Sequence, residues 1–402
     1  DQRLGEHEYV IEFFLGENNL YGFLMGKDYL DYVVLPLEID FIANISELLA
    51  SLKQRNFNTY SSLAFSVYNK LLSPVLQKLQ LNGNDPNNLV VIPDGILGYI
   101  PFEVLIQSKP AEGSSYKDLN YLINNYQISY HYSVKLFLLD RKVVDHKEHG
   151  PFLGFAPAFI DKVSPQYLAL NERTRAFIDT LTAIPDAEKE VSSIAKLLKG
   201  RAQLGIAATE HNFKQLAGNY KILHLASHSI IEDEEPMYSK LLFDNEQDSI
   251  EDGFLHTYEL YNMDLNADLV TLSSCNTGVG KLYKGEGIIS LARGFMYAGV
   301  PNLVMSLWSV SDKPTKDLMT YFYEELKNGE TKSAALRKAK LRYLEQADNY
   351  TSNPYYWSSF IYLGQVEKEK GLQNKYIWLS FLGLFAVLSL ALIWNRRKRT
   401  AN

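Results

Sequence analysis

Short apolar runs alternate with helical patterns through the second half of the chain, and this alternation constrains the fold more than any other feature. Residues 269–272 and 303–307 form two such runs, and a helical pattern over 287–298 separates them. Continuous apolar strands are typical of a parallel sheet that is covered on both faces. Parallel neighbours also need a crossover helix between them. The pattern therefore predicts an α/β fold with a mainly parallel sheet between two layers of helices.

Other elements follow from the same periodicities. In the second half we expect further strands over residues 152–155 and 222–226, and helices over 185–198, 317–327 and 332–346. The first third differs, because its apolar and polar residues alternate in short runs that begin at Tyr9, Asn19 and Tyr32. Such alternation predicts a small antiparallel meander. It is followed by helical periodicity over 42–79, a strand over 89–93 and a helix from Pro101.

A polar stretch over residues 142–150 (KVVDHKEHG) is the expected boundary between two parts of the chain. We predict an N-terminal part over 1–145, with the meander and its helices, and an α/β domain over 146–366. The N-terminal part either packs beside this domain or forms a degenerate second half of it.

The C-terminal segment over residues 376–394 has no charged residue and is close to the roughly 20 residues that a helix needs to cross a bilayer. Tyr376, Trp378 and Trp394 lie near its ends, as interfacial aromatic residues do. We predict a transmembrane helix over 376–394, a juxtamembrane linker over 367–375 and a basic tail over 395–402; the alternative is a buried core helix. The expected location is therefore a single-pass C-terminal membrane anchor, with the body of the chain on the extracytoplasmic side.

Composition excludes several classes of function. A formal net charge of -7 argues against a general nucleic-acid-binding surface, so we expect no nucleic-acid partner. With one cysteine, Cys275, the chain cannot form an intrachain disulfide or a cysteine-rich zinc site. A lone thiol is either a small buried apolar group or a reactive one, and its surroundings distinguish the two.

Two of the predicted strands end in residues that carry chemistry. His228 follows the run in KILHLASHS, and Cys275 follows the run in LVTLSSCNTG. Because sites in parallel sheets form beyond the carboxyl ends of the strands, both side chains are expected to face one crevice. An imidazole can take the proton of a thiol and return it to a leaving amine. The pair therefore indicates nucleophilic catalysis; the alternative is an inert, buried Cys275.

Several ordered segments resemble the CHAT family, a branch of the caspase-like peptidases related to separase. They include HLASHS, SKLLF, DGFLHTYEL, LSSCNTGVG, GEGIISLARGFMYAGV and SLWSVSD, with VIPDGILGYIPFEVL and FLGFAPAF upstream. The resemblance implies a caspase-like three-layer α/β/α sandwich and a cysteine endopeptidase with His228 and Cys275 as its dyad. It also implies an oxyanion hole formed by the backbone N–H groups of Ser229 and Cys275. The family usually has glycine where this chain has Ser229, which is compatible only if that backbone does not need a positive φ.

The segment SLWSVSD implies the substrate contacts. It resembles the strand and loop that hold the substrate in separase, so Asp312 is expected to pair with a basic P1 side chain and Trp308 to line the same pocket. The alternatives are that Asp312 caps a helix or turn and that Trp308 belongs to the core.

The expected partners are a protein or peptide substrate, the membrane through the C-terminal helix, and a tetratricopeptide-type segment upstream, because CHAT domains often follow such helices. The sequence requires no metal or organic cofactor, although related enzymes sometimes need Ca²⁺. The alternative function is a catalytically weak or inactive scaffold that has the same fold and acts in protein–protein interaction or signalling at the membrane.

Overall fold

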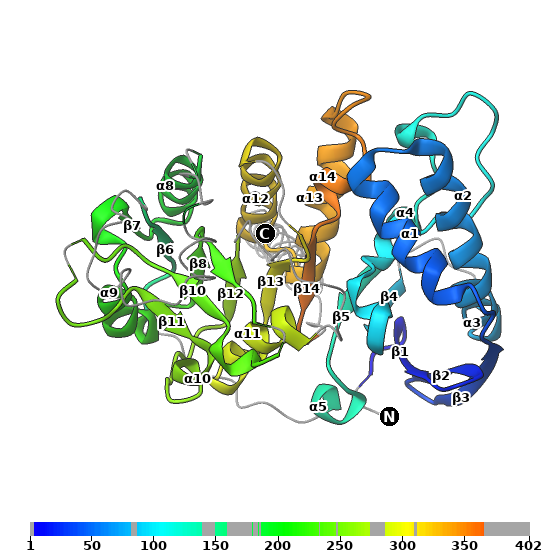
Figure 1. The fold of residues 1–402 in the computed structure, drawn as a ribbon, viewed down its shortest axis with the longest axis horizontal. Coiled ribbons are helices and arrows are strands. Elements are labelled where there is room, and N and C mark those ends of the chain that lie inside the picture. Colours follow the sequence, from blue (N-terminus) through cyan, green and yellow to red (C-terminus); the bar gives the residue numbers. More distant parts are fainter. Residues whose placement is uncertain are drawn as a thin grey trace, which may run out of the picture.

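The computed structural model describes residues 4–81, 87–138, 149–158, 179, 184, 186–232, 234–246, 248–273, 286–308 and 312–365. In these ranges eleven strands form one sheet, in the order β3-β2-β1-β4-β5-β14-β13-β12-β8-β6-β7 (Figure 1). Their bounds are β1 Glu8–Leu15, β2 Asn19–Gly26, β3 Tyr29–Pro36, β4 Asn87–Ile92, β5 Tyr126–Tyr130, β6 Leu153–Ala156, β7 Arg201–Leu204, β8 Ile222–Leu225, β12 Leu269–Leu272, β13 Leu303–Ser306 and β14 Phe360–Leu363. A separate three-stranded sheet contains β9 Ser229–Ile230, β10 Lys240–Leu242 and β11 Phe254–His256.

The predicted antiparallel meander is confirmed and forms one edge of the large sheet. β1 pairs with β2 and β2 with β3, both antiparallel. Side chains along a strand point alternately to the two faces of a sheet. In β2 one face therefore buries Leu20 and Leu24 against the core, and the other face exposes Phe23. The sequence did not indicate that β1 also pairs with β4 in parallel, or that β4 pairs with β5 in the same sense.

The predicted parallel sheet of the second half is also confirmed. β13, β12, β8, β6 and β7 are parallel neighbours, and β14 joins β13 in the antiparallel sense. All four residues of β12 are buried, as expected for a strand covered on both faces. The mixed α/β fold predicted from the alternating pattern is therefore present.

The helices of the described ranges surround this sheet (Figure 1). Their bounds are α1 Phe41–Gln54, α2 Phe57–Val67, α3 Ser73–Lys78, α4 Leu122–Asn125, α5 Val134–Leu138, α8 Ala187–Leu198, α9 Glu210–Leu216, α10 Thr257–Leu260, α11 Glu286–Tyr297, α12 Asp312–Lys327, α13 Lys332–Gln346 and α14 Pro354–Trp357.

Side-chain contacts place helices on both faces of the second half. Tyr323 of α12 donates a hydrogen bond to Thr271 of β12, 2.8 Å away, on one face. On the opposite face Phe155 of β6 packs edge-on against Phe213 of α9, with ring centroids 5.5 Å apart. The three-layer arrangement follows from these contacts, and one large apolar cluster extends through both halves of the described chain.

The helix predicted from Pro101 is wrong in extent. The chain forms only a 3-10 turn, Phe102–Val104, and then extends. The carbonyls that would continue a helix have tertiary partners: Val104 O accepts a hydrogen bond from Tyr60 Oη at 2.6 Å, and Leu105 O accepts one from Leu122 N at 2.8 Å. The turn brings Glu103 inward to meet Lys340 of α13, with 2.6 Å between the charged atoms.

The two halves of the sheet meet where β14 pairs in parallel with β5, through Leu363 and Tyr130. Helix α13 contacts both strands, and Gln127 of β5 donates a hydrogen bond to Ser333 at its start, 2.7 Å away. The predicted division of the chain near residue 145 lies outside the described ranges and stays a prediction.

The predicted fold class and location need one correction. The expected transmembrane helix over 376–394 lies outside the described residues, and within the described ranges no helix has the length and apolar character to cross a bilayer. The longest helix there, α12, has 16 residues and includes several charged ones, whereas a span needs roughly 20 apolar residues. The fold is therefore a mixed α/β fold without an established membrane helix, and both the membrane partner and the single-pass membrane location are withdrawn.

Candidate active site

The carboxyl ends of β8 and β12 meet at one edge of the sheet. The two strands are parallel neighbours with Leu225 opposite Leu272, and Ser273 N donates a hydrogen bond to Leu225 O at 2.9 Å just beyond both strands. His228 is the third residue after β8 and Cys275 the third after β12. Cys275 lies outside the described residues, so its distance to His228 stays open.

His228 is held at this edge by the small sheet. The residue is only 4% exposed, and its backbone carbonyl accepts a hydrogen bond from Leu242 N of β10 at 2.9 Å. The preceding residue, Ser227, donates its hydroxyl to the carbonyl of Leu242. These bonds fix the backbone on both sides of the imidazole, so its position is set by β10.

Ser229, the predicted oxyanion residue, opens β9. It is buried and is not among the residues with a positive φ, so this backbone does not need the extra freedom of glycine. Ser229 faces Leu241 across the antiparallel pair. The hydrogen bond between these strands is made by the neighbouring residues, from Leu242 N to the His228 carbonyl. In an antiparallel ladder hydrogen-bonded and non-hydrogen-bonded pairs alternate, so Ser229 and Leu241 form a non-hydrogen-bonded pair. The Ser229 N–H therefore points away from β10.

The two predicted substrate contacts lie beyond β13. Trp308 is 7% exposed, stacks on Tyr355 with ring centroids 6.1 Å apart, and donates its indole N–H to Tyr355 O at 2.9 Å. Most of its surface is therefore taken by the protein itself. Asp312 is the first residue of α12, and its side chain lies outside the described part of the structure, so its role in binding P1 stays a prediction.

His224 belongs to a buried polar chain beneath the sheet. Its ring nitrogens lie 2.8 Å from Glu190 Oε1 and 3.0 Å from Tyr323 Oη. Burial raises the pKa of Tyr323, and the hydrogen bond that this hydroxyl makes to Thr271 opposes the rise. Both ring nitrogens of His224 thus contact protein groups, which accords with a structural role rather than metal ligation.

Comparison with known proteins identifies the family. The model of the CHAT domain matches residues 62–365. This chain belongs to the CHAT domain family. Human tetratricopeptide repeat protein 28 is 24% identical over 337 residues, which cover 74% of this chain but only 13% of that protein. The chain thus spans about an eighth of the length of this curated relative.

A solved structure supports the fold of this CHAT domain. Separase in the Saccharomyces cerevisiae separase–securin complex has a TM-score of 0.52 and 12% identity, covering 89% of this chain and 30% of that one. A likeness of this degree shows a shared fold. The Arg-specific cysteine proteinase gingipain R aligns with a TM-score of 0.46 and 11% identity over 74% of this chain and 67% of that one.

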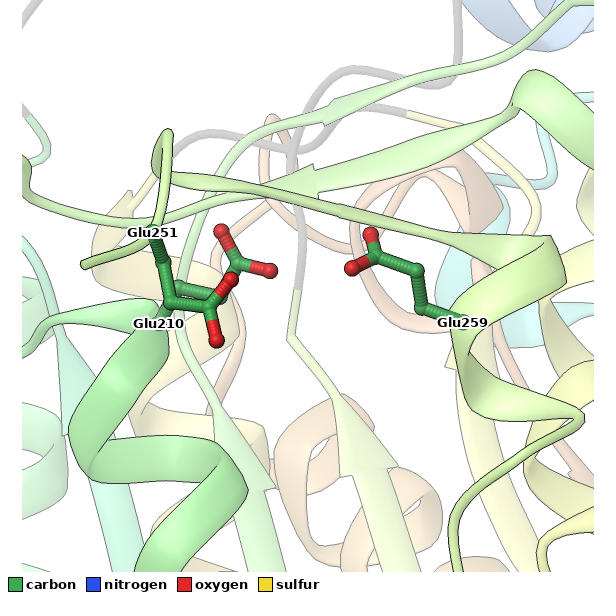
Figure 2. Close-up of side chains that lie close together, drawn as sticks. All are labelled: Glu210, Glu251 and Glu259. Carbon is green, nitrogen blue, oxygen red and sulfur yellow. The ribbon is translucent and has the colours of Figure 1, made fainter.

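A charged cluster lies beside the small sheet that holds His228. Glu210 of α9, Glu251 and Glu259 of α10 turn their carboxylates toward a common centre (Figure 2). The ammonium of Lys214 lies 2.7 to 2.8 Å from an oxygen of each carboxylate. Oxygen ligands of this kind suit Ca²⁺, but here Lys214 supplies the positive charge. The spacing of Glu210 and Lys214, four residues apart on one helix, was the only signal in the sequence.

This cluster joins α9 to the sheet that holds His228. Glu210 Oε2 accepts a hydrogen bond from Gly253 N at 3.0 Å, directly before β11, and Glu259 Oε2 accepts one from His256 N at 2.8 Å, at the end of β11. β11 pairs with β10, and β10 with β9. The Lys214 cluster therefore fixes the far side of the sheet whose edge strand begins after His228.

The cluster makes stability depend on pH in a way that can be measured. Burial raises the pKa of Glu210 to about 7, and Lys214 only partly opposes this rise. Between about pH 4.5, where the carboxyl ionises in the unfolded chain, and about 7, the folded CHAT domain holds the proton more tightly. We therefore expect the contribution of Glu210 to stability to fall as pH rises through this window, by up to about 3 kcal/mol.

Urea unfolding at pH 5 and pH 8 checks this expectation by comparing the natural chain with Glu210→Gln. Glutamine does not titrate, so the Glu210→Gln chain lacks this pH dependence. The free energy of unfolding of the Glu210→Gln chain, relative to that of the natural chain, should therefore be higher at pH 8 than at pH 5. An equal pH dependence for both chains would contradict the assignment. Glu330→Gln serves as the matched control. The Glu330 side chain is 32% exposed and forms an ion pair with Lys338.

Proposed function

We propose that this CHAT domain is a cysteine endopeptidase that cleaves peptide bonds through an acyl-enzyme on Cys275. The observation that carries the proposal is the common sheet edge of β8 and β12, linked by the 2.9 Å hydrogen bond between Ser273 N and Leu225 O. His228 and Cys275 each follow one of these strands by three residues. The family and the separase-like fold support it.

In the proposed reaction the His228 imidazole takes the proton of the Cys275 thiol, and the thiolate attacks the scissile carbonyl carbon. His228 then protonates the leaving amine, and a water molecule hydrolyses the thioester. The N–H groups of Ser229 and Cys275 stabilise the oxyanion. The orientation of the Ser229 N–H away from β10 supports its part in this step.

We further propose a basic P1 residue, recognised by Asp312 and flanked by Trp308. Asp312 begins α12, a few residues beyond the carboxyl end of β13, and β13 is the parallel neighbour of β12. A carboxylate in a pocket suits an arginine side chain because it can accept two parallel hydrogen bonds.

The test uses fluorogenic peptides that end in arginine or aspartate, with the natural chain beside Cys275→Ala. We expect cleavage after arginine that falls to background when the thiol is removed. Equal rates for the two chains would refute the peptidase. Cleavage after aspartate alone would keep the peptidase and refute the role of Asp312.

The alternative function is a non-catalytic scaffold for protein–protein interaction, and the matches to tetratricopeptide repeat proteins favour it. In that case a tetratricopeptide-type segment would act together with this domain. Labelling with a thiol-reactive probe at neutral pH separates the two functions, because an activated Cys275 should react faster than a free thiol and a buried one more slowly.

A further inference from the structure

A small apolar pocket lies where the two halves of the chain meet, on the sheet face that α11 covers. Aliphatic side chains of β13 and β14 and aromatic residues at the end of β5 line it, among them Tyr99, Tyr130, Tyr132, Met305, Ile361 and Leu363. Its walls therefore come from both halves, next to the Leu363–Tyr130 pair that joins β14 to β5. None of these residues takes part in the proposed peptidase chemistry.

One cation stands at this pocket. Arg293 of α11 is among the lining residues and is exposed, and its guanidinium lies 5.2 Å from the centre of the Tyr132 ring. In the part of the chain that the structure describes, no carboxylate forms an ion pair with it. This cation–π contact holds the guanidinium beside the apolar walls and leaves its N–H donors available for an anion.

The size of the pocket limits its occupant. Its cavity of about 100 Å³ is smaller than the roughly 150 Å³ engineered cavity that accepts benzene. It therefore suits one branched aliphatic side chain and is too small for a long acyl chain. The guanidinium beside it favours a carboxylate next to that apolar group, because bidentate pairing with arginine adds both affinity and orientation.

We infer that this pocket docks a peptide segment of a partner protein in which an aliphatic residue stands next to an acidic one. The aliphatic side chain fills the space between β5 and β14, and the carboxylate pairs with Arg293. α11, which contributes Arg293, begins at Glu286, eleven residues after Cys275 in the sequence. The docking site does not depend on the peptidase being active.

Fluorescence polarisation of labelled heptapeptides tests the inference, with the full chain as Cys275→Ala so that no peptide is cut. The probes carry Asp-Leu, Lys-Leu or Asp-Ala at the centre of a Gly/Ser sequence, and labelled myristate is the lipid arm. We expect Asp-Leu to bind at least about tenfold more tightly than either other peptide, which matches the loss of one charge-assisted contact or one buried side chain.

Arg293→Gln should weaken Asp-Leu binding about tenfold and leave the weak Lys-Leu binding unchanged. Arg201→Gln, an exposed arginine on edge strand β7, is the matched control and should bind Asp-Leu as before. Ile361→Phe fills the pocket and should weaken Asp-Leu binding while melting shows the chain folded. Equal binding of the three peptides, no effect of Arg293→Gln, or a preference for myristate would each overturn the inference.

Discussion

Replacing His228 by alanine is expected to lower kcat/KM for cleavage of an arginine-ending peptide by about 10²- to 10⁴-fold. The imidazole is the proposed proton acceptor for Cys275 and the donor to the leaving amine, and alanine offers neither function. The backbone bond from Leu242 N to the His228 carbonyl survives the change, so the edge of the small sheet should keep its position. Steady-state kinetics with a fluorogenic peptide gives the number.

His211→Ala is the matched control for this experiment. Its ring forms no hydrogen bond within the described ranges, and its backbone N–H, which donates to Asp248 Oδ2 at 3.0 Å, is kept. Added imidazole should restore part of the rate of the His228→Ala chain, because a small base can occupy the space that the side chain leaves. A purely structural role for His228 would show no such rescue, and full activity of the alanine form would rule out the dyad.

Replacing Lys340 by methionine is expected to lower the free energy of unfolding by about 3–5 kcal/mol. Lys340 and Glu103 are both almost fully buried, with 2.6 Å between Nζ and Oε1. Burial lowers the pKa of Lys340, and the Glu103 carboxylate opposes this shift. Without the ammonium, Glu103 remains buried with the Tyr130 hydroxyl as its hydrogen-bond donor, 2.6 Å away.

Urea denaturation of two further chains defines the cause of this loss. Lys340→Met with Glu103→Gln should recover most of the stability, because the amide oxygen can still accept from Tyr130 without a charge. Lys338→Met on the same helix breaks an ion pair whose lysine side chain is 47% exposed and should cost less than about 1 kcal/mol. A loss for Lys340→Met no larger than for Lys338→Met would show that the buried pair contributes little.

Periodicity predicted the regular elements well where the hydrophobic pattern had one solution. The apolar runs over 269–272 and 222–226 could only be buried strands, and the helix over 332–346 was predicted with the bounds that the structure has. Around Pro101 the local pattern favoured a helix, but Tyr60 and Leu122 took the carbonyls that it needed. Residues far apart in the chain decided that segment.

Some features of the candidate site could be predicted from the sequence, and others could not. The order of motifs around His228 and Cys275 indicated the CHAT family, and strand ends predicted that the two residues share a sheet edge. The Lys214 cluster could not be foreseen, because Glu210, Glu251 and Glu259 are brought together only by α9, a loop and α10. Likewise Lys340 stands in a polar helical segment that resembles a solvated surface until Glu103 packs against it.

By itself the sequence therefore determined the parallel α/β architecture, the meander and the family, since these depend on short-range periodicity and on ordered motifs. Only the tertiary structure decided how the two halves join through β14 and β5, which charges are buried in pairs, and where an apolar pocket opens beside Arg293. The physical reason is that these features depend on contacts between distant segments. The free-energy cost of a charged side chain depends on whether distant segments bury it, and the local sequence pattern does not indicate such burial.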